Sequence, residues 1–302
     1  MNRLNTILFA TDLSEASAHA LEHAALIAAK NDAALHVVNV RVPFSESVFA
    51  RAAEMPGHRE LDEALESHTK AEIEGLKPSL DIPVIKRVLS DYDAAKAITE
   101  YAEQNQIDLI IVGTHQRHGL AQLFLGSVAG RIIRQSSMSV LAVGPDERQA
   151  GLASRYERIL VPVDFSQASE RALRNARRMA EAHDSELIAV HVIENVPYPA
   201  YYTAGAHTIM EAFPDLARRT REAFKQLLVK NEADKARVIV TEGKAHQKID
   251  DVARENDVDM IVMGWNGLGD VEARLLGSVT ERTLRRAPCP VLVDKSDEAL
   301  NV

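Results

Sequence analysis

The sequence of 302 residues repeats itself, and this duplication constrains the fold more than any other feature. With a shift of 152 positions, residues 5–40 are identical to residues 157–192 at 14 of 36 positions. A second co-linear block, at a shift of 151, aligns Leu125–Val128 with Leu276–Val279. A period of this length is far too long for a solenoid repeat, so the sequence predicts two similar domains in tandem.

We expect the first domain at residues 1–145 and the second at residues 156–298, with a short polar linker at 146–155 between them. The chain is 46% hydrophobic and 26% charged, which is typical of globular domains, and each half is long enough to bury its own core. The net charge of −9 divides into −5 for the first 145 residues and −4 for the remainder. Such even acidity disfavours nonspecific binding to nucleic acid or to a membrane surface.

The start of the chain and its cysteine content indicate a cytoplasmic protein. Met1–Thr6 leads directly into a short apolar run that Asp12 ends, which predicts no secretory signal peptide. The apolar runs are all shorter than the roughly 18 residues that a membrane span needs. The one cysteine, Cys289, excludes an internal disulfide and an all-cysteine metal site; between two prolines and before a buried strand, we expect it to be inert packing.

Five short apolar runs in each half, bounded by turn residues, predict buried strands. Apolar residues at helical spacing lie between these runs, and Ser14 and Ser166 precede the first helices as N-caps. The alternation predicts an α/β fold in which each domain is an open five-stranded parallel sheet with helices on both faces. Ligands of such sheets bind beyond the carboxyl ends of the strands, where the strand order reverses. The strands are expected at Thr6–Ala10, Ala34–Val40, Pro83–Leu89, Asp108–Val112 and Val140–Val143, and at Ile159–Val163, Glu186–Ile193, Arg237–Thr241, Asp259–Met263 and Val291–Val293.

Glycines follow the fourth strand of the second half. Gly264 ends the strand, Gly267 follows it, and Gly277 precedes Ser278, where a helix begins. Glycine lets the backbone approach an anion closely, and a helix start offers unpaired N–H groups. Strand, glycine loop and helix N-terminus together would form a phosphate cradle. A glycine at a strand end and a Gly-Ser helix cap are also ordinary structural features, so the spacing by itself leaves both interpretations open.

The same four residues fit the pattern G-x2-G-x9-G-[S/T], and with it the chain resembles the universal stress protein family over nearly its whole length. The resemblance implies Rossmann-like domains of the adenine nucleotide alpha hydrolase-like type, and ATP bound in the second half. It implies that Pro162 and Asp164 line the base and ribose pocket, and that Val192 contacts the adenine. Mg²⁺ or Mn²⁺ accompanying ATP would be held mainly by the phosphates. The implied site residues are Pro162, Asp164, Val192, Met263, Gly264, Asn266, Gly267, Gly277, Ser278 and Val279.

The first half departs from this pattern. Gln116 stands where the second glycine belongs, and Ala10 replaces the proline, although Asp12 remains. Ser90 stands near the position of Gly243. A side chain at 116 would project toward the phosphates or bar the backbone conformation of the loop. We therefore expect a degenerate structural or regulatory first half.

The other candidate residues give weaker evidence for a function. His115 and His118 are three apart, but two ligands do not make a zinc site, so no protein-held metal is expected. The cluster Tyr198–Tyr202 is interpreted as a loop packing on its own domain, with an aromatic lid or a partner surface as the alternative. The chain has neither a phosphate-loop lysine motif nor a nucleophile elbow, and we assign no catalytic residue.

The sequence thus predicts an ATP-binding, nucleotide-dependent stress-response regulator. The alternatives are a slow metal-dependent ATPase, using Asp164 or a loop water, and a scaffold in which ATP is only structural. We expect Val140–Val143 and Val291–Val293 to pair within one chain as a pseudo-twofold dimer, because apolar edge strands favour pairing. A homodimer and unidentified protein partners remain open.

Overall fold

The computed structural model describes residues 2–43, 58–114, 125–144, 156–194, 209–267, 276–295 and 300–301. Two compact units account for the chain, one of residues 3–154 and one of residues 155–301 together with the first two residues. The expected linker, at 146–155, lies outside the described residues.

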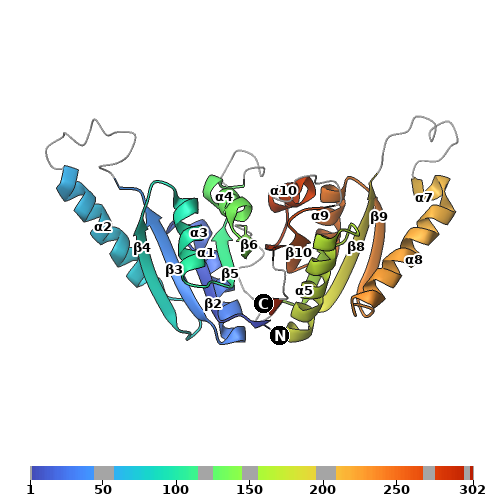
Figure 1. Ribbon diagram of the computed structural model, residues 1–302, viewed down its shortest axis with the longest axis horizontal. Coiled ribbons are helices and arrows are strands. Elements are labelled where there is room, and N and C mark those ends of the chain that lie inside the picture. The colour runs from blue at the N-terminus through green and yellow to red at the C-terminus, as the bar shows by residue number, and fades with distance from the viewer. Residues whose placement is uncertain are drawn as a thin grey trace. The chain divides into compact units, whose positions relative to one another are not determined.

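The first unit is a five-stranded parallel sheet with the order β4-β3-β2-β5-β6, connected by helices (Figure 1). Its strands are β2 (Thr6–Ala10), β3 (Ala34–Arg41), β4 (Val84–Ser90), β5 (Leu109–Gly113) and β6 (Ser139–Val143), preceded by β1 (Asn2–Arg3). Its helices are α1 (Glu15–Asn31), α2 (His58–Gly75), α3 (Ala94–Gln104) and α4 (Ser127–Gln135).

The second unit repeats this arrangement with the order β9-β8-β7-β10-β11, again all parallel (Figure 1). Its strands are β7 (Arg158–Pro162), β8 (Glu186–Glu194), β9 (Arg237–Gly243), β10 (Met260–Gly264) and β11 (Val291–Asp294), followed by β12 (Leu300–Asn301). Its helices are α5 (Gln167–His183), α7 (Ile209–Ala212), α8 (Pro214–Lys230), α9 (Ala245–Glu255) and α10 (Ser278–Leu284). The predicted fold class, two tandem α/β domains with parallel sheets, is confirmed.

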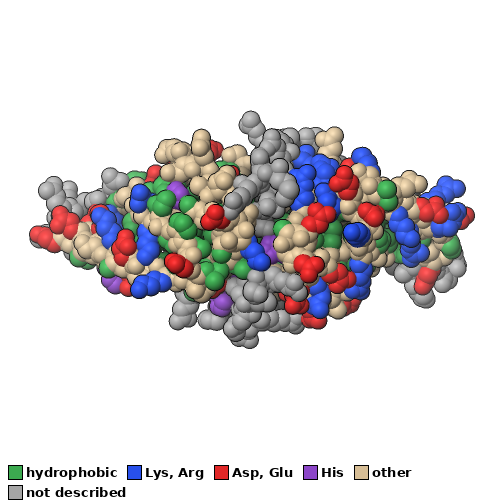
Figure 2. Space-filling view, turned by 90° about the horizontal axis from the view of Figure 1, so that it is seen from below, with side chains coloured by type: hydrophobic (Ala, Val, Ile, Leu, Met, Phe, Trp, Pro, Cys, Tyr) green, Lys and Arg blue, Asp and Glu red, His purple; other side chains and the backbone are tan. Residues whose placement is uncertain are grey.

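The central strands β2, β5, β7 and β10 form because their residues are mostly apolar, which suits a sheet that is covered on both faces. All of β10 and β6 is buried, as is the centre of β7. Acidic and basic side chains are interspersed over both units on the face that Figure 2 shows. Among the helices that the structure describes, none combines the length and the apolar character that crossing a membrane requires.

The first helix of each unit begins and ends in the same way. The hydroxyls of Ser14 and Ser166 accept the amides of residues three positions later, at 3.3 and 3.1 Å, so both serines are N-caps as predicted. The helices end at Asp32 and Asp184, which adopt the left-handed conformation with φ of 50° and 53°. The duplication therefore extends to the backbone of the helix ends.

The strand order reverses between β7 and β10. From β7 the chain moves outward to β8 and β9, and then returns to β10 on the other side of β7. Because parallel crossovers are right-handed, α5 and α8 lie on one face of the sheet and α9 and α10 on the other. The carboxyl ends of β7 and β10 are thus free of a covering crossover, which is where open α/β sheets bind ligands.

Gly264 lets α5 approach the end of β10. A Cβ at position 264 would lie 2.8 Å from the backbone carbon of Ala168 and 2.9 Å from its oxygen. Backbone atoms in the first turn of a buried helix cannot move aside cheaply. The first glycine of the pattern is therefore required by packing, before any ligand is considered.

We predict that Gly264→Ala lowers the free energy of unfolding by about 1–3 kcal/mol without any ligand present, because the added methyl overpacks this contact. Gly75→Ala is the matched control. A Cβ at Gly75 would meet nothing within 4 Å. This substitution should be neutral or mildly stabilising. Urea unfolding of both variants measures the difference, and equal stabilities would contradict the assignment.

Candidate functional site

The expected site residues lie on elements that end or begin at one edge of the second unit. Pro162 ends β7, Met263 and Gly264 end β10, and Ser278 begins α10. Val192 lies two residues before the end of β8. Since these strands are parallel, their carboxyl ends meet at the same edge of the sheet.

A tight turn after β7 fixes the carboxylate of Asp164. Its Oδ1 accepts the amide of Ser166 at 3.0 Å, and the amide of Asp164 donates to the hydroxyl of Ser169 at 3.3 Å. Between them Phe165 has φ of 66°, a conformation that non-glycine residues rarely adopt. The other carboxylate oxygen, Oδ2, lies 2.6 Å from the point that a Cβ of Gly267 would occupy. The aspartate therefore lies directly against the glycine loop.

Aromatic packing holds the strained residue. The Phe165 ring meets His191 edge-on, with centroids 4.8 Å apart, and also packs against the buried Phe224 at 6.1 Å. Nδ1 of His191 donates to the carbonyl of Val163 at 2.7 Å, which ties β8 to the start of the turn. Sequence reasoning did not identify these residues, because the partners lie far apart in the chain and follow no periodic pattern.

The two ends of the glycine loop are tied together. The amide of Gly277 donates to the carbonyl of Trp265 at 2.8 Å, and the buried hydroxyl of Thr280 donates to the carbonyl of Gly264 at 2.9 Å. Gly277 is the N-cap residue of α10 and makes no side-chain cap. The start of α10, whose first N–H groups have no partner within the helix, is thereby fixed beside the end of β10.

The remaining implied residues flank this connection. Asn266 and Val279 are half-buried, and Met263 is buried. Residues 268–275 of the loop lie outside the described residues. The loop thus presents backbone amides at its ends, with a fixed carboxylate opposite.

A half-buried lysine also lies at this edge. Lys295 follows β11, whose last residue Asp294 is paired with Gly264, and its ammonium group lies 5.9 Å above the ring of Trp265. Burial lowers the pKa of Lys295 to about 8. The sequence analysis missed Lys295 and Trp265, although each lies two residues after the end of a predicted strand, at the ligand-binding edge.

The first unit has the same turn and the same helix start at this edge, but its side chains differ. Oδ1 of Asp12 accepts the amide of Ser14 at 3.1 Å, and Gly126 is the N-cap residue of α4. Thr114, the counterpart of Trp265, donates its amide to the carbonyl of Val143 at 2.7 Å. Ala10 is buried at the end of β2.

Several residues that the sequence singled out lie outside the described residues: Gln116, His115, His118, Tyr198, Tyr201 and Tyr202. Within the described ranges, no group of three or more histidine, cysteine, aspartate or glutamate residues could hold a metal ion. Cys289 is buried, and as the one cysteine of the sequence it forms no internal disulfide.

Comparison with known proteins gives a consistent result. The model of the universal stress protein family matches residues 3–144 and 155–295. A universal stress protein of Methanocaldococcus jannaschii is 33% identical over 144 residues, which are 46% of this chain and 82% of that protein. Universal stress protein A homolog 1 of Coxiella burnetii is 35% identical over 137 residues, covering 45% of this chain and 94% of that protein.

A solved structure matches both halves at once. A universal stress protein from Archaeoglobus fulgidus aligns with a TM-score of 0.67 over 98% of this chain and 100% of that chain, at 24% identity. At this level of identity the match supports the fold alone, which is two such domains in one chain.

The contact between α9 and α10 contains an unusual carboxyl group. The side chain of Asp250 is 7% exposed, its Oδ1 has no hydrogen-bond partner, and its Oδ2 lies 3.3 Å from Nε of Arg286. Burial raises the pKa of Asp250 to about 6, against the opposing effect of Arg286. In the first unit the same position is Thr99, whose hydroxyl donates to the carbonyl of Ala95 at 3.1 Å.

Because the pKa of Asp250 is raised on folding, its ionisation destabilises the fold as pH rises from about 4 through 6. With an unfolded pKa of 3.8 and a folded pKa of about 6, the loss is on the order of 3 kcal/mol at neutral pH. We predict that Asp250→Asn raises the free energy of unfolding at pH 7.5, and that this gain shrinks by roughly half at pH 5. Its neighbour on the same helix, Asp251, is half-exposed and paired with Lys248, so Asp251→Asn is the control. A gain that does not change with pH would contradict the assignment.

Proposed function

The chain belongs to the universal stress protein family, and we propose that its second half binds ATP and that the protein is a nucleotide-dependent regulator of a stress response. The observation that carries this proposal is the meeting of Asp164 with Gly267 at the strand-order reversal. There a fixed carboxylate, a side-chain-free loop position and the start of α10 lie together.

The groups present suit the parts of a nucleotide. Val192, Met263 and Pro162 offer apolar contact to the adenine, and the carboxylate of Asp164 can accept hydrogen bonds from ribose hydroxyls. The amides around Gly267, Ser278 and Val279, with the side chains of Asn266 and Ser278, would bind phosphates. Gly277 would hold this helix start in place, since its amide already donates to the carbonyl of Trp265. A Mg²⁺ or Mn²⁺ ion would be bound mainly through the phosphates and water.

Regulation requires that ATP stabilises one conformation or partner complex over another. The strained Phe165 turn and the tied glycine loop are the elements that a bound nucleotide would touch first. The proposal includes a cytoplasmic location, because a sequence with one cysteine has no internal disulfide. It also includes the pairing of the two halves through β6 and β11, which are outermost in their own sheets.

We predict one ATP per chain, bound in the second half, as measured by calorimetric titration. Gly267→Gln copies the residue of the first half into the site, and its side chain would collide with Asp164 at 2.6 Å. Affinity should fall at least a hundredfold, equivalent to about 2.7 kcal/mol. Gly75→Gln, at an open helix end, should bind normally, and Gln116→Gly should restore little in the first half. Two equivalent sites, or full affinity in Gly267→Gln, would show that the site is misassigned.

We predict that ATP turnover is far slower than the roughly 1–10³ s⁻¹ of ordinary enzymes. No phosphate-loop lysine motif occurs in the sequence, so the transition-state charge has little dedicated stabilisation. Multiple-turnover phosphate release in the presence of Mg²⁺ or Mn²⁺ measures the rate. An ordinary rate that is lost in a folded Asp164→Ala variant would make the protein an ATPase.

A further inference from the structure

Two helices in equivalent places of the two units carry charge of opposite sign. α2 lies between β3 and β4 in the chain, and α8 lies between β8 and β9, each beside the outermost strand of its own sheet (Figure 1). α2 has six acidic and two basic residues, a net charge of −4. α8 has two acidic and five basic residues, a net charge of +3. The two helices are therefore complementary in charge.

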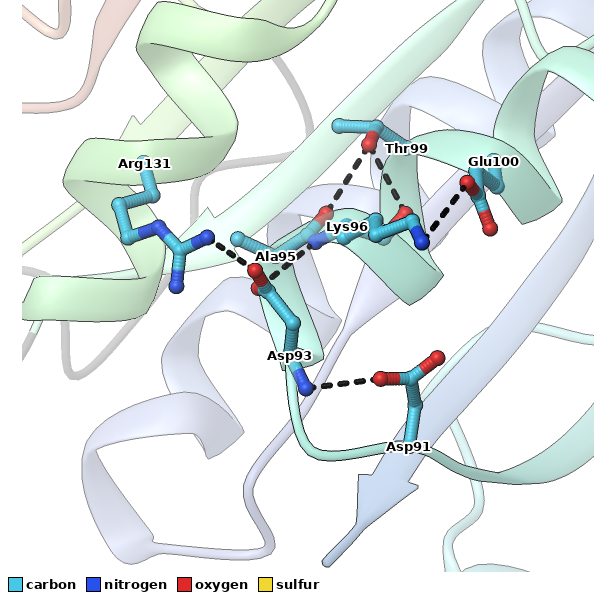
Figure 3. A network of polar contacts seen from close by, with 7 residues as sticks. All are labelled: Asp91, Asp93, Ala95, Lys96, Thr99, Glu100 and Arg131. Carbon is cyan, nitrogen blue, oxygen red and sulfur yellow. Dashed lines mark hydrogen bonds and ion pairs between the residues drawn. The ribbon is translucent and has the colours of Figure 1, made fainter.

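Charged side chains on other helices neutralise one another within the unit. Figure 3 shows this for α3, where the carboxylate of Asp93 accepts the amide of Lys96 at 3.1 Å and pairs with Arg131 of α4. The ammonium group of Lys96 lies 3.7 Å from the carboxylate of Glu100. Such a surface offers a partner little net charge, and α2 and α8 differ from it.

The acids of α2 divide into a paired and an unpaired set. Arg41 of β3 pairs with Asp62 and with Glu66, which fixes the helix to its own sheet. Glu60 and Glu63 are exposed, and neither forms an ion pair with any residue that the structure describes. The outer face of α2 thus keeps unpaired charges of negative sign.

The outer face of α8 keeps unpaired charges of positive sign. Its two acids, Asp215 and Glu222, both pair with Arg218. Arg221 and Lys225 are exposed and have no carboxylate partner in the described part of the chain. They are four residues apart, so their side chains are neighbours on the surface of the helix.

Exposed apolar side chains accompany both sets of charges. Leu61 and Leu65, four residues apart on α2, are 46% and 43% exposed. Val229 of α8 is 64% exposed, and its N-cap residue Phe213 is 48% exposed. Of the eight large hydrophobic side chains that are exposed in the described ranges, four lie on these two helices. Apolar surface bordered by charge is typical of a site that binds another protein.

A second copy of the chain is the partner that these charges fit. A polyanion such as a nucleic acid would be attracted to α8 but repelled by α2. A second copy presents an acidic α2 to the basic α8, and a basic α8 to the acidic α2. Contacts between two different surfaces of identical chains are heterologous, and complementary charge favours their encounter.

We propose that α8 of one chain docks on α2 of a second copy, and that the protein self-associates through this contact. The charges steer the approach, and Leu61, Leu65 and Val229 supply apolar area to the interface. The assembly closes as a dimer where each copy uses both of its helices on the same partner, and it extends into longer oligomers where it does not. This inference is independent of the proposed nucleotide site.

Sedimentation velocity of the full-length chain over a range of protein concentrations tests the contact. The wild type should associate as the concentration rises. Raising the salt from about 0.05 M to about 0.5 M should weaken the association roughly tenfold, because salt screens exposed charges.

Charge reversal identifies the two surfaces. An acid-reversed chain carries Glu60→Lys with Glu63→Lys, and a base-reversed chain carries Arg221→Glu with Lys225→Glu. Each alone should associate at least roughly tenfold more weakly than the wild type, because like charges then face each other. An equimolar mixture of the two reversed chains should associate again, since both contacts between them are complementary.

Two controls change the net charge by the same amounts elsewhere. Glu100→Lys with Glu103→Lys reverses two exposed acids of α3, and Lys235→Glu with Lys244→Glu reverses two exposed bases at opposite ends of β9. Both should leave the association unchanged. Circular dichroism and urea unfolding establish that each variant is folded.

Four results would overturn the proposal. The wild type could remain a monomer at every concentration, or both reversed chains could associate as the wild type does, which would assign the contact to another face. The reversed chains could dissociate but fail to recover in the mixture, which would show that α2 and α8 do not face each other. Equal weakening in the control variants would show that net charge, and not these helices, governs association.

Discussion

The contact on which the second unit depends is the one between the end of β10 and the first turn of α5. β10 follows the reversal of strand order, and α5, the helix after β7, packs on it. The backbone of Ala168 lies so close to position 264 that no side chain fits there. This close approach sets the position of the Asp164 turn relative to the loop that starts at Gly264. The candidate site is thus a consequence of helix packing, and its first glycine serves the fold before it serves a ligand.

Most of the fold could be predicted from the sequence, because most strands are largely apolar runs bounded by turn residues and the caps are local signals. The start of α10 lies at the predicted Ser278, and strand ends differ from the predicted ones by at most two residues. Strands ended late, as at β9, because ladder pairing with β8 extends to Gly243 beyond the apolar run. The glycines of the site could be found by spacing. The ring of His191 and the ammonium of Lys295 could not, because their importance comes from partners distant in the chain.

Comparison of the two halves shows which features both units share and in which features they differ. The serine caps, the left-handed helix ends and the parallel strand order are common to both units. The differences lie in side chains at matched backbone positions: Thr114 against Trp265, Thr99 against Asp250, Asp93 against Lys244. In each case the first unit satisfies its polar groups internally. The second unit instead carries a buried carboxyl oxygen without a hydrogen-bond partner, Oδ1 of Asp250.

Both units have a strained residue after their first strand, and this shows whether the strain comes from the fold or from a ligand site. Phe165 and Leu13 occupy matched positions and have nearly equal positive φ, 66° and 65°. A conformation that costs free energy persists only where the surroundings enforce it. Since the first unit keeps this strain without the glycine pattern, the strain belongs to the fold, where it aims the aspartate at the loop. A nucleotide site of the kind proposed for the second half then requires only that the side chains around an inherited turn leave position 267 free and supply charge.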